Sequence, residues 1–291
     1  MRYLFISMRP QQWTKNLVVL AALVFSQNAI HKGLLAVAAA AFLLFCVLSG
    51  SVYLINDAVD AKRDKWHPVK KHRPIAAGLL DARIAVWAAV LMSTASIAIA
   101  FRIGSGFAVA SCCYLALQIL YSFYLKHFVI VDVLSIAAGF VLRVVAGAAA
   151  IHVPVSHWIL SCTLMLALFL GLAKRRHELK SLKDEGKEHR KILTEYSIPL
   201  LDQMISIVAS VTVVTYTLYT ISPETIARFG TDRLIYTVPF LLYGLFRYLF
   251  LIYERDMGGA PDAVLLTDKP LIACIFSYLI AVWLIIYVFH R

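Results

Sequence analysis

Apolar runs of about 20 residues recur along this chain, and they constrain its fold more than any other feature. A helix of that length crosses the hydrocarbon core of a bilayer, where each backbone polar group must be hydrogen-bonded within the protein. The 291-residue chain is 61% hydrophobic, which exceeds the share in soluble domains. The runs predict an all-α integral membrane protein with nine transmembrane helices, at roughly 16–30, 35–55, 82–101, 106–125, 129–150, 157–174, 201–222, 234–253 and 271–289.

The basic residues gather in every second loop between these runs. Of the 28 Lys and Arg residues, 21 fall on one side of the predicted membrane and five on the other, while Arg143 and Arg247 lie inside runs. The positive-inside rule therefore predicts a cytoplasmic N-terminus in the inner (plasma) membrane, and an odd number of spans places the C-terminus outside. Topology and an anionic ligand account for the net charge of +11, so no nucleic-acid partner is expected.

Cysteine and histidine provide no sign of a disulfide framework or a zinc site. The five cysteines all fall in apolar runs, their number is odd, and no CxxC motif occurs. The histidines of the basic loops lack HxxxH or HExxH spacing. The segment Met1 to Asn16 is too polar for the apolar core of a cleavable signal.

The stretch from Asn56 to Gly78 is the most polar part of the chain. On a helix, offsets of four and eight residues fall on one face, so Asn56, Asp60 and Asp64 align with Asp57 close by. Carboxylates on one face repel one another unless a cation lies among them. Oxygen ligands without His or Cys suit Mg²⁺, which often completes its coordination with substrate phosphates. These four residues are the predicted metal ligands, and Asp57, Asp60 and Asp64 are the candidate catalytic residues; a solvated loop is the alternative.

Basic residues follow this cluster and also precede the first run. Lys70, Lys71 and Arg73 could hold phosphate charge, since Lys and Arg are the usual phosphate-binding side chains. Asp81 is placed to cap the third run. Near the N-terminus, Arg9, Gln12, Lys15 and Asn16 could face the same site, although anchoring of an interfacial helix is an equal alternative for Gln12 and Lys15.

Three further candidates lie near the start of the fifth run, together with an arginine inside it. Tyr121, Lys126 and Asp132 lie at the predicted cytoplasmic boundary, where an aromatic belt with a snorkelling lysine is the alternative to a substrate site. Arg143 lies inside an apolar run, where a guanidinium is costly unless it is paired. It therefore either pairs with an acid on another helix or binds a ligand anion. Gly139, Ala146 and Gly147 form a small-residue face for close helix packing.

A second polar cluster follows the sixth run. Lys174, Arg175 and Glu178 lie at the membrane boundary, and beyond Glu178 the mixed charges predict a solvated helical cap. This cluster and the one that begins at Asn56 lie four spans apart on the same side of the membrane. Their placement suggests an internal duplication around one site.

The segment Asn56 to Asp64, NDAVDAKRD, resembles the NDxxDxxxD motif of the UbiA superfamily of intramembrane prenyltransferases. The resemblance covers essentially the whole chain and implies a single UbiA-like transmembrane domain over 1–291, with active-site loops at about 56–81 and 174–198. Within the superfamily, the chain is more similar to the decaprenyl-phosphate phosphoribosyltransferases. The similarity rests on RPQQWTKNLVV, LINDAVDAKRDKWHPVKKHRPIAAG, YSFYLKHFVIVDV, GFVLRVVAGA, AKRRHEL and GGAPDAVLLTDKPL.

One departure separates this chain from superfamily members that prenylate aromatic rings. Those members carry a second aspartate-rich motif after the sixth span, where this chain has Lys174, Arg175, Arg176 and Glu178. Two acidic motifs suit two metals that hold a prenyl diphosphate. One acidic and one basic motif suit a donor with an additional phosphate.

The resemblance therefore implies Mg²⁺-dependent transfer of a phosphoribosyl group from 5-phosphoribosyl 1-diphosphate to a polyprenyl phosphate. The implied phosphate contacts are Gln12, Lys15, Lys70, Arg73, Lys126, Lys174 and Arg175. For Glu178 the resemblance leaves two roles open, to orient one of those cations or to bind the ribose. Small-residue faces permit self-association, and the resemblance leaves a homotrimer open. A conventional prenyltransferase acting on an aromatic acceptor is the first alternative. An organic-anion transporter is the second, although its site would be expected near the midplane of the membrane.

Overall fold

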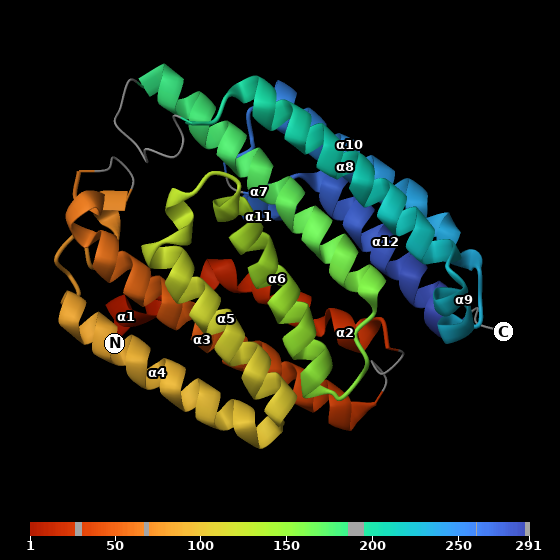
Figure 1. The fold of residues 1–291 in the computed structure, drawn as a ribbon, viewed down its shortest axis with the longest axis horizontal. Helices are drawn as coiled ribbons and strands as arrows, with labels where there is room; N and C mark the ends of the chain where they lie inside the picture. The colour runs from red at the N-terminus through yellow and green to blue at the C-terminus, as the bar shows by residue number, and fades with distance from the viewer. Residues whose placement is uncertain (27–30, 67–69, 186–194, 260, 289–291) are drawn as a thin grey trace. The chain divides into compact units, whose positions relative to one another are not determined.

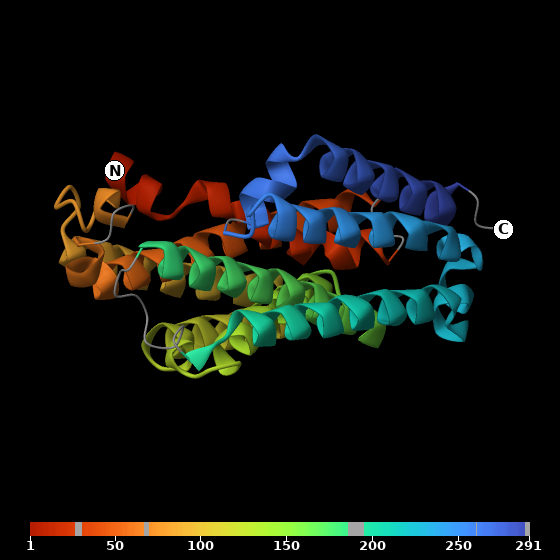
Figure 2. The same cartoon turned by 90° about the horizontal axis from the view of Figure 1, so that it is seen from above.

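The computed structural model describes residues 1–26, 31–66, 70–185, 195–259 and 261–288 (Figures 1 and 2). These residues form helices and connecting turns, with no β-strand among them. Eight of the helices are long and apolar enough to cross a membrane, so the chain is a multi-pass membrane protein. They are Lys32–Asp64, Ala82–Ile103, Ser105–Phe123, Val131–Ala150, His157–Ser181, Ile198–Ile221, Arg233–Glu254 and Lys269–Tyr287.

The eight helices correspond to the second to ninth predicted runs. The first run, 16–30, falls on different local structure: the 3₁₀ helix η1 (Pro10–Leu20) is followed by the short α-helix α2 (Ala21–Val24). Residues 27–30 lie outside the described part of the chain. The ninth span and the cytoplasmic N-terminus therefore remain predictions.

The chain divides into two compact units, and the boundary falls inside helix α6 (Val131–Ala150). The first unit comprises Met1–Leu125 and Val141–Val155, and the second comprises Lys126–Phe140 and Ser156–Arg291. Each unit has its own apolar core.

In the first unit, α3 (Lys32–Asp64) packs along α4 (Ala82–Ile103), as Figure 1 shows, and η1 lies against α3. The unit also holds α1 (Arg2–Ser7) and α5 (Ser105–Phe123). Its core contains the tilted aromatic rings of Phe45, Phe107 and Tyr114. The predicted cap of α4 is confirmed, because Asp81 accepts a hydrogen bond of 2.6 Å from the backbone N–H of Arg83.

Gly147 on α6 permits a close backbone approach within the first unit. A Cβ atom built on Gly147 would lie 1.9 Å from the carbonyl oxygen of Val19 in η1. No side chain fits at that distance, so the small-residue packing face predicted around Gly147 is confirmed at this position. The contact fixes the N-terminal segment against the second half of α6.

In the second unit, α7 (His157–Glu185) packs against α8 (Ile198–Ile221), and α10 (Val238–Glu254) packs against α12 (Lys269–Tyr287), as Figure 2 shows. Short helices α9 (Pro223–Phe229), η5 (Arg233–Thr237) and α11 (Pro261–Thr267) connect them. Asp268 caps α12 by accepting a hydrogen bond of 2.9 Å from the N–H of Leu271.

The mixed-charge cap predicted beyond Glu178 is described in part. Helix α7 continues to Glu185, and residues 186–194 lie outside the described residues. The prediction for that stretch, which includes Lys187, therefore stays a prediction.

Candidate functional site

The polar residues from Asn56 to Asp64 continue helix α3 beyond its apolar part. The helix runs without a break to Asp64, so Asp57 and Asp64, seven residues apart, lie on one face. Both are buried, with 2% and 4% of their surface exposed, whereas Asn56 and Asp60 are half-buried. Since carboxylates are rarely buried without partners, this face requires positive charge next to it.

Two arginines from outside α3 supply that charge. Nη1 of Arg73 lies 3.0 Å from Oδ1 of Asp57 and 2.6 Å from Oδ2 of Asp64. Arg9 donates from Nη2 to the same Oδ1 of Asp57, and its guanidinium lies 4.8 Å from the centre of the Tyr53 ring. The two buried carboxylates thus converge on one guanidinium nitrogen.

The segment from Lys70 to Gly78 holds Arg73 beside the acidic face. Lys70 begins a 3₁₀ turn in which its carbonyl accepts the N–H of Arg73 at 3.0 Å. Gly78 follows with a φ of 74°, a left-handed conformation that glycine adopts without steric cost. Between them, Ile75 packs with Leu54 of α3 and Ala85 of α4. This apolar contact anchors the loop beside the acidic face.

The acidic face has the donor chemistry of a magnesium site. Among the described residues, no group of three or more His, Cys, Asp or Glu side chains is gathered closely enough to hold a metal ion. The carboxylate oxygens of Asp57 and Asp64 nevertheless converge on positive charge, which the guanidinium of Arg73 supplies to both and that of Arg9 supplies to Asp57. Carboxylate and amide oxygens without His or Cys suit Mg²⁺. The four predicted ligands therefore fit a hard cation by type.

The N-terminal candidates lie in the same unit as the acidic face. Gln12 and Lys15 are half-buried in η1, and Nζ of Lys15 donates to Oε1 of Gln12. Lys70 is half-buried in the turn that precedes Arg73, and Tyr121 is half-buried near the end of α5. Gln12 and Lys15 belong to η1, which lies against α3, and Lys70 belongs to the turn that follows α3 in the chain.

Arg143 is buried in the first unit with 6% of its surface exposed. Its Nε donates to Oδ1 of Asn16 at 2.9 Å, and its Nη2 donates to the hydroxyl of Tyr114 at 2.9 Å. Its guanidinium also lies 4.7 Å from the centre of the Tyr114 ring. Both of these partners are uncharged side chains that accept hydrogen bonds from the guanidinium. The role of Tyr114 was not predicted, because no spacing links a residue of α5 to one of α6.

In the second unit, two predicted residues, Asp132 and Glu178, contact a third, Arg175. Its Nε donates to Oδ2 of Asp132 at 2.6 Å, and its Nη1 donates to Oε2 of Glu178. Arg175 is 3% exposed and Asp132 is fully buried. Of the remaining candidates, Lys126 is buried and Lys174 is half-buried. The structure thus unites residues of α6 and α7 that are 43 positions apart in sequence.

Tyr196 also belongs to this cluster, although no sequence pattern predicted a role for it. Its hydroxyl donates to Oδ1 of Asp132 at 2.9 Å and accepts the backbone N–H of Ile130 at 2.6 Å. Burial, reinforced by the charge of Asp132, raises the pKa of Tyr196 to about 12, while the hydrogen bond from Ile130 acts in the opposite direction. The hydroxyl therefore stays protonated at neutral pH and remains a donor. Since Tyr196 and Asp132 lie 64 residues apart, no local motif connects them.

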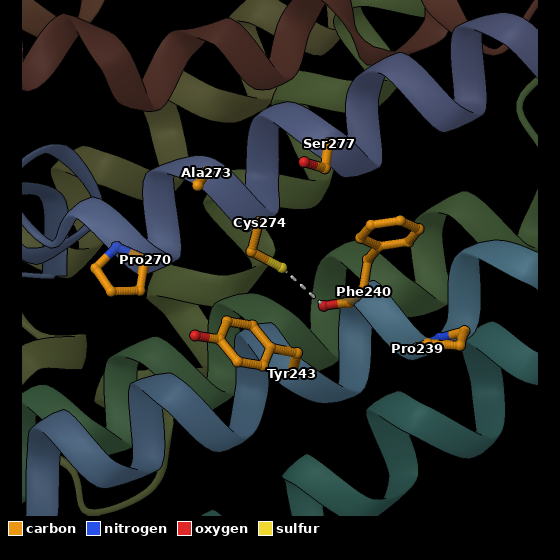
Figure 3. Close-up of a pocket in the computed structure, with 7 residues that line it drawn as sticks. All are labelled: Pro239, Phe240, Tyr243, Pro270, Ala273, Cys274 and Ser277. Carbon is orange, nitrogen blue, oxygen red and sulfur yellow. Dashed lines mark hydrogen bonds between the residues drawn. The ribbon is translucent and has the colours of Figure 1, made fainter.

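A groove between α10 and α12 is a separate feature of the second unit (Figure 3). Its volume is about 460 Å³, and the thiol of Cys274 donates to the carbonyl of Phe240 across it at 3.2 Å. No acid or basic residue lines this groove, so it has none of the chemistry expected of the predicted site. The lining residues are Pro239, Phe240, Tyr243, Pro270, Ala273, Cys274 and Ser277.

Known proteins are similar to this chain in sequence and in fold. The model of the UbiA prenyltransferase family matches residues 16–267. A decaprenyl-phosphate phosphoribosyltransferase from Mycolicibacterium smegmatis is 34% identical over 276 residues, which cover 91% of this chain and 86% of the relative. A protein of the same name from Corynebacterium glutamicum is 34% identical over 295 residues, covering 96% and 86%. The structure of a UbiA homolog from Archaeoglobus fulgidus, bound to GPP and Mg²⁺, matches with a TM-score of 0.73 at 18% identity, covering 98% of this chain and 100% of that chain.

Proposed function

Because the chain belongs to the UbiA prenyltransferase family, we propose that it is a polyprenyl-phosphate phosphoribosyltransferase. It would transfer the 5-phosphoribosyl group of 5-phosphoribosyl 1-diphosphate to a polyprenyl phosphate and release diphosphate. The observation that carries this proposal is the 34% identity to two relatives of that name over more than nine-tenths of this chain. The basic cluster at Lys174 and Arg175 agrees with a donor that carries an additional phosphate.

The proposed reaction exchanges one bond at C1 of the ribose. The C1–O bond to diphosphate breaks, and its electron pair leaves with the diphosphate. A phosphate oxygen of the lipid attacks C1, and a phosphodiester forms as C1 passes through oxocarbenium-like character. The nucleophile is already an anion, so no strong general base is needed. Positioning and electrostatic stabilisation are therefore the main tasks of the protein.

The acidic face of α3 would bind the diphosphate end of the donor through magnesium. Asn56, Asp57, Asp60 and Asp64 would hold the Mg²⁺, which neutralises charge on the departing diphosphate when bound. Arg73 would then bind a donor phosphate, because the metal charge replaces its own between Asp57 and Asp64. Further candidates for phosphate contacts in the first unit are Gln12, Lys15 and Lys70, with Tyr121 and Arg143 as additional substrate contacts.

The cluster of the second unit would also serve substrate binding. Lys126, Lys174 and Arg175 supply positive charge for phosphate, and Glu178 presents an accessible carboxylate. Asp132 is fully buried and bonded to Arg175, which favours a role in holding that arginine rather than in touching substrate.

We further propose that the enzyme lies in the inner membrane with nine spans, a cytoplasmic N-terminus and a cytoplasmic active site. The distribution of Lys and Arg supports this orientation. The match of the family model to residues 16–267 supports one UbiA-like domain over 1–291. A homotrimer remains a proposal, for which light scattering of the purified protein is the direct measurement.

A paired assay tests the proposed function. Purified protein receives Mg²⁺ and either phosphoribosyl diphosphate with polyprenyl phosphate, or a prenyl diphosphate with an aromatic acceptor. The second pair is included because a homolog of the same fold binds GPP. We expect lipid-linked ribose 5-phosphate from the first pair alone. A prenylated aromatic product, with no transfer from the first pair, would contradict the proposal.

A further inference from the structure

A continuous series of hydrogen bonds in the second unit links the backbone at Ile130 to the carboxylate of Glu178. The N–H of Ile130 donates to the hydroxyl of Tyr196, which donates to Oδ1 of Asp132. Oδ2 of Asp132 accepts from Nε of Arg175, and Nη1 of Arg175 donates to Glu178. We call these five residues the Tyr196 network.

The Tyr196 network is anchored at a strained position. Ile130 has a φ of 68°, a left-handed conformation that is rare for a β-branched residue. Its carbonyl accepts the first hydrogen bonds of α6, from Val133 at 3.1 Å and Leu134 at 2.9 Å. The hydroxyl of Tyr196 accepts the N–H that this conformation presents. Strain of this kind persists where the surrounding structure specifies it, often near a functional site.

Accessibility increases from one end of the series to the other. Asp132 is fully buried, the side chain of Arg175 is 4% exposed, and the side chain of Glu178 is 30% exposed. Glu178 is therefore the most accessible member of this charged series. A carboxylate repels phosphate oxygens but accepts hydrogen bonds from hydroxyl groups. Acidic side chains bind ribose hydroxyls in this way in dinucleotide-binding domains.

We propose that Tyr196 is a positioning residue that acts through Asp132 and Arg175 on Glu178, and that Glu178 accepts a hydrogen bond from the ribose 2-hydroxyl of the donor. This inference rests on the proposed function, since it assumes a phosphoribosyl donor. It gives the two ends of the network different tasks. The buried end holds the Arg175 guanidinium in one orientation, and the exposed end selects ribose.

The neighbouring arginine provides a matched control. Nε of Arg176 donates to Oδ1 of Asp202 at 2.5 Å, and the hydroxyl of Tyr253 donates to the same oxygen at 3.1 Å. Arg176, Asp202 and Tyr253 thus repeat, within the same unit, the hydrogen-bonding chemistry of Arg175, Asp132 and Tyr196. Its Asp202 side chain, however, is 33% exposed, whereas Asp132 is fully buried. Removing the Tyr253 hydroxyl therefore tests the loss of a similar hydrogen bond outside the Tyr196 network.

The experiment compares the wild type, Tyr196→Phe, Tyr253→Phe and Glu178→Gln. Each is assayed with 5-phosphoribosyl 1-diphosphate and with its 2-deoxy analogue. Glu178→Gln should reduce the preference for the ribose donor by about 10-fold or more, because the site loses its charged acceptor. Tyr196→Phe should raise KM for the ribose donor by about 10-fold and reduce the same preference, with kcat within about 2-fold. Tyr253→Phe should match the wild type in KM for the ribose donor and in its preference for that donor.

A double variant separates positioning from general structural damage. If Tyr196 acts through Glu178, Tyr196→Phe combined with Glu178→Gln should discriminate between the donors no worse than Glu178→Gln alone. The inference would be overturned if the double variant lost donor preference by the product of the two single losses. It would also be overturned if Tyr196→Phe had the wild-type KM and donor preference. Transfer by the wild type is measured first, so failure of the proposed function is recognised separately.

Arg175→Lys covers the case in which Tyr196→Phe does not fold. Lysine keeps the charge but lacks the planar fork that contacts Asp132 and Glu178 together. We expect this variant to lose the preference for the ribose donor. A preserved preference in Arg175→Lys would overturn the inference independently.

Discussion

Nη1 of Arg73 lies 2.6 Å from Oδ2 of Asp64, which joins the basic loop after α3 to the acidic end of that helix. The same nitrogen lies 3.0 Å from Oδ1 of Asp57. The acidic and basic parts of this polar stretch are therefore one interacting cluster. A cation bound between the carboxylates would change the partners of Arg73, so metal binding and donor binding should depend on each other.

The first prediction concerns the acidic face. Asp57→Asn removes a buried carboxylate on which Arg9 and Arg73 converge. We expect magnesium-dependent turnover to fall by at least about 100-fold, since a lost ligand should cost more than a lost outer-shell partner of a metal. Turnover is measured across a magnesium titration, and folding is checked by size-exclusion chromatography in detergent. Asp81→Asn is the control, because asparagine also caps a helix and Asp81 lies outside the cluster.

The second prediction concerns the approach of η1 to α6. Gly147→Ala places a Cβ atom against the carbonyl of Val19, where the available distance is 1.9 Å. Overpacking should outweigh the better helix propensity of alanine and destabilise the protein by about 1–3 kcal/mol. Gly33→Ala is the matched control, since nothing lies within 4 Å of its added Cβ. Thermal unfolding in detergent should show a lower Tm for Gly147→Ala alone, and equal Tm values would refute the close contact.

The third prediction compares two aspartates that accept from arginines. Asp132→Ala removes the buried carboxylate that accepts from Nε of Arg175 and should cost about 3–5 kcal/mol of stability. Asp202→Ala removes a partly exposed partner of Arg176, and it should cost about 1 kcal/mol or less. Denaturant or thermal unfolding measures the loss of stability in each variant. The account would fail at this point if the two variants were equally stable.

The order in which helices follow one another was predictable from the sequence, because apolar length alone identifies a membrane helix. The eight spans from Lys32 to Tyr287 match eight predicted runs, and Asp81 caps a helix where expected. The segment 16–24 was the exception, since apolar composition does not distinguish an α-helix from the 3₁₀ structure that follows Pro10.

The candidate site was predictable where its residues share one helix. The spacing of Asp57 and Asp64 shows that they lie on one face of α3. Arg9, predicted only as a residue that could face the site, joins them. The contacts of Tyr196 with Asp132 and of Tyr114 with Arg143 were not predicted. These contacts depend on how separate segments pack, and a single sequence carries no signal for such pairs.

The fourth prediction is a pH dependence at the start of α12. Asp268 accepts hydrogen bonds from Nε and Nη2 of Arg247 at 3.1 and 2.8 Å. These bonds, with the N–H of Leu271 and the charge of Arg247, hold the pKa of Asp268 below its usual value of 3.8, while burial opposes them. Because the folded pKa is depressed, the contribution to stability is present above the unfolded pKa and is lost as pH falls through the folded pKa.

The Tm difference between the wild type and Asp268→Asn measures this contribution. The difference should be constant from about pH 7 to pH 5 and should shrink below about pH 4. In an Arg247→Met background the decrease of this Tm difference below about pH 4 should disappear, because the substitution removes the main cause of the lowered pKa of Asp268. A difference that grows with acidity would contradict the assignment.

The most direct test of the proposed function follows two labels through one reaction. The donor carries one isotope in its 5-phosphate and another in its diphosphate, and it is incubated with the protein, Mg²⁺ and polyprenyl phosphate. We expect the 5-phosphate label to enter the lipid fraction and free diphosphate that carries the second label to appear in the aqueous phase in equal amount. Entry of the diphosphate label into the lipid, or retention of both labels in water with an active, folded protein, would contradict the proposed function.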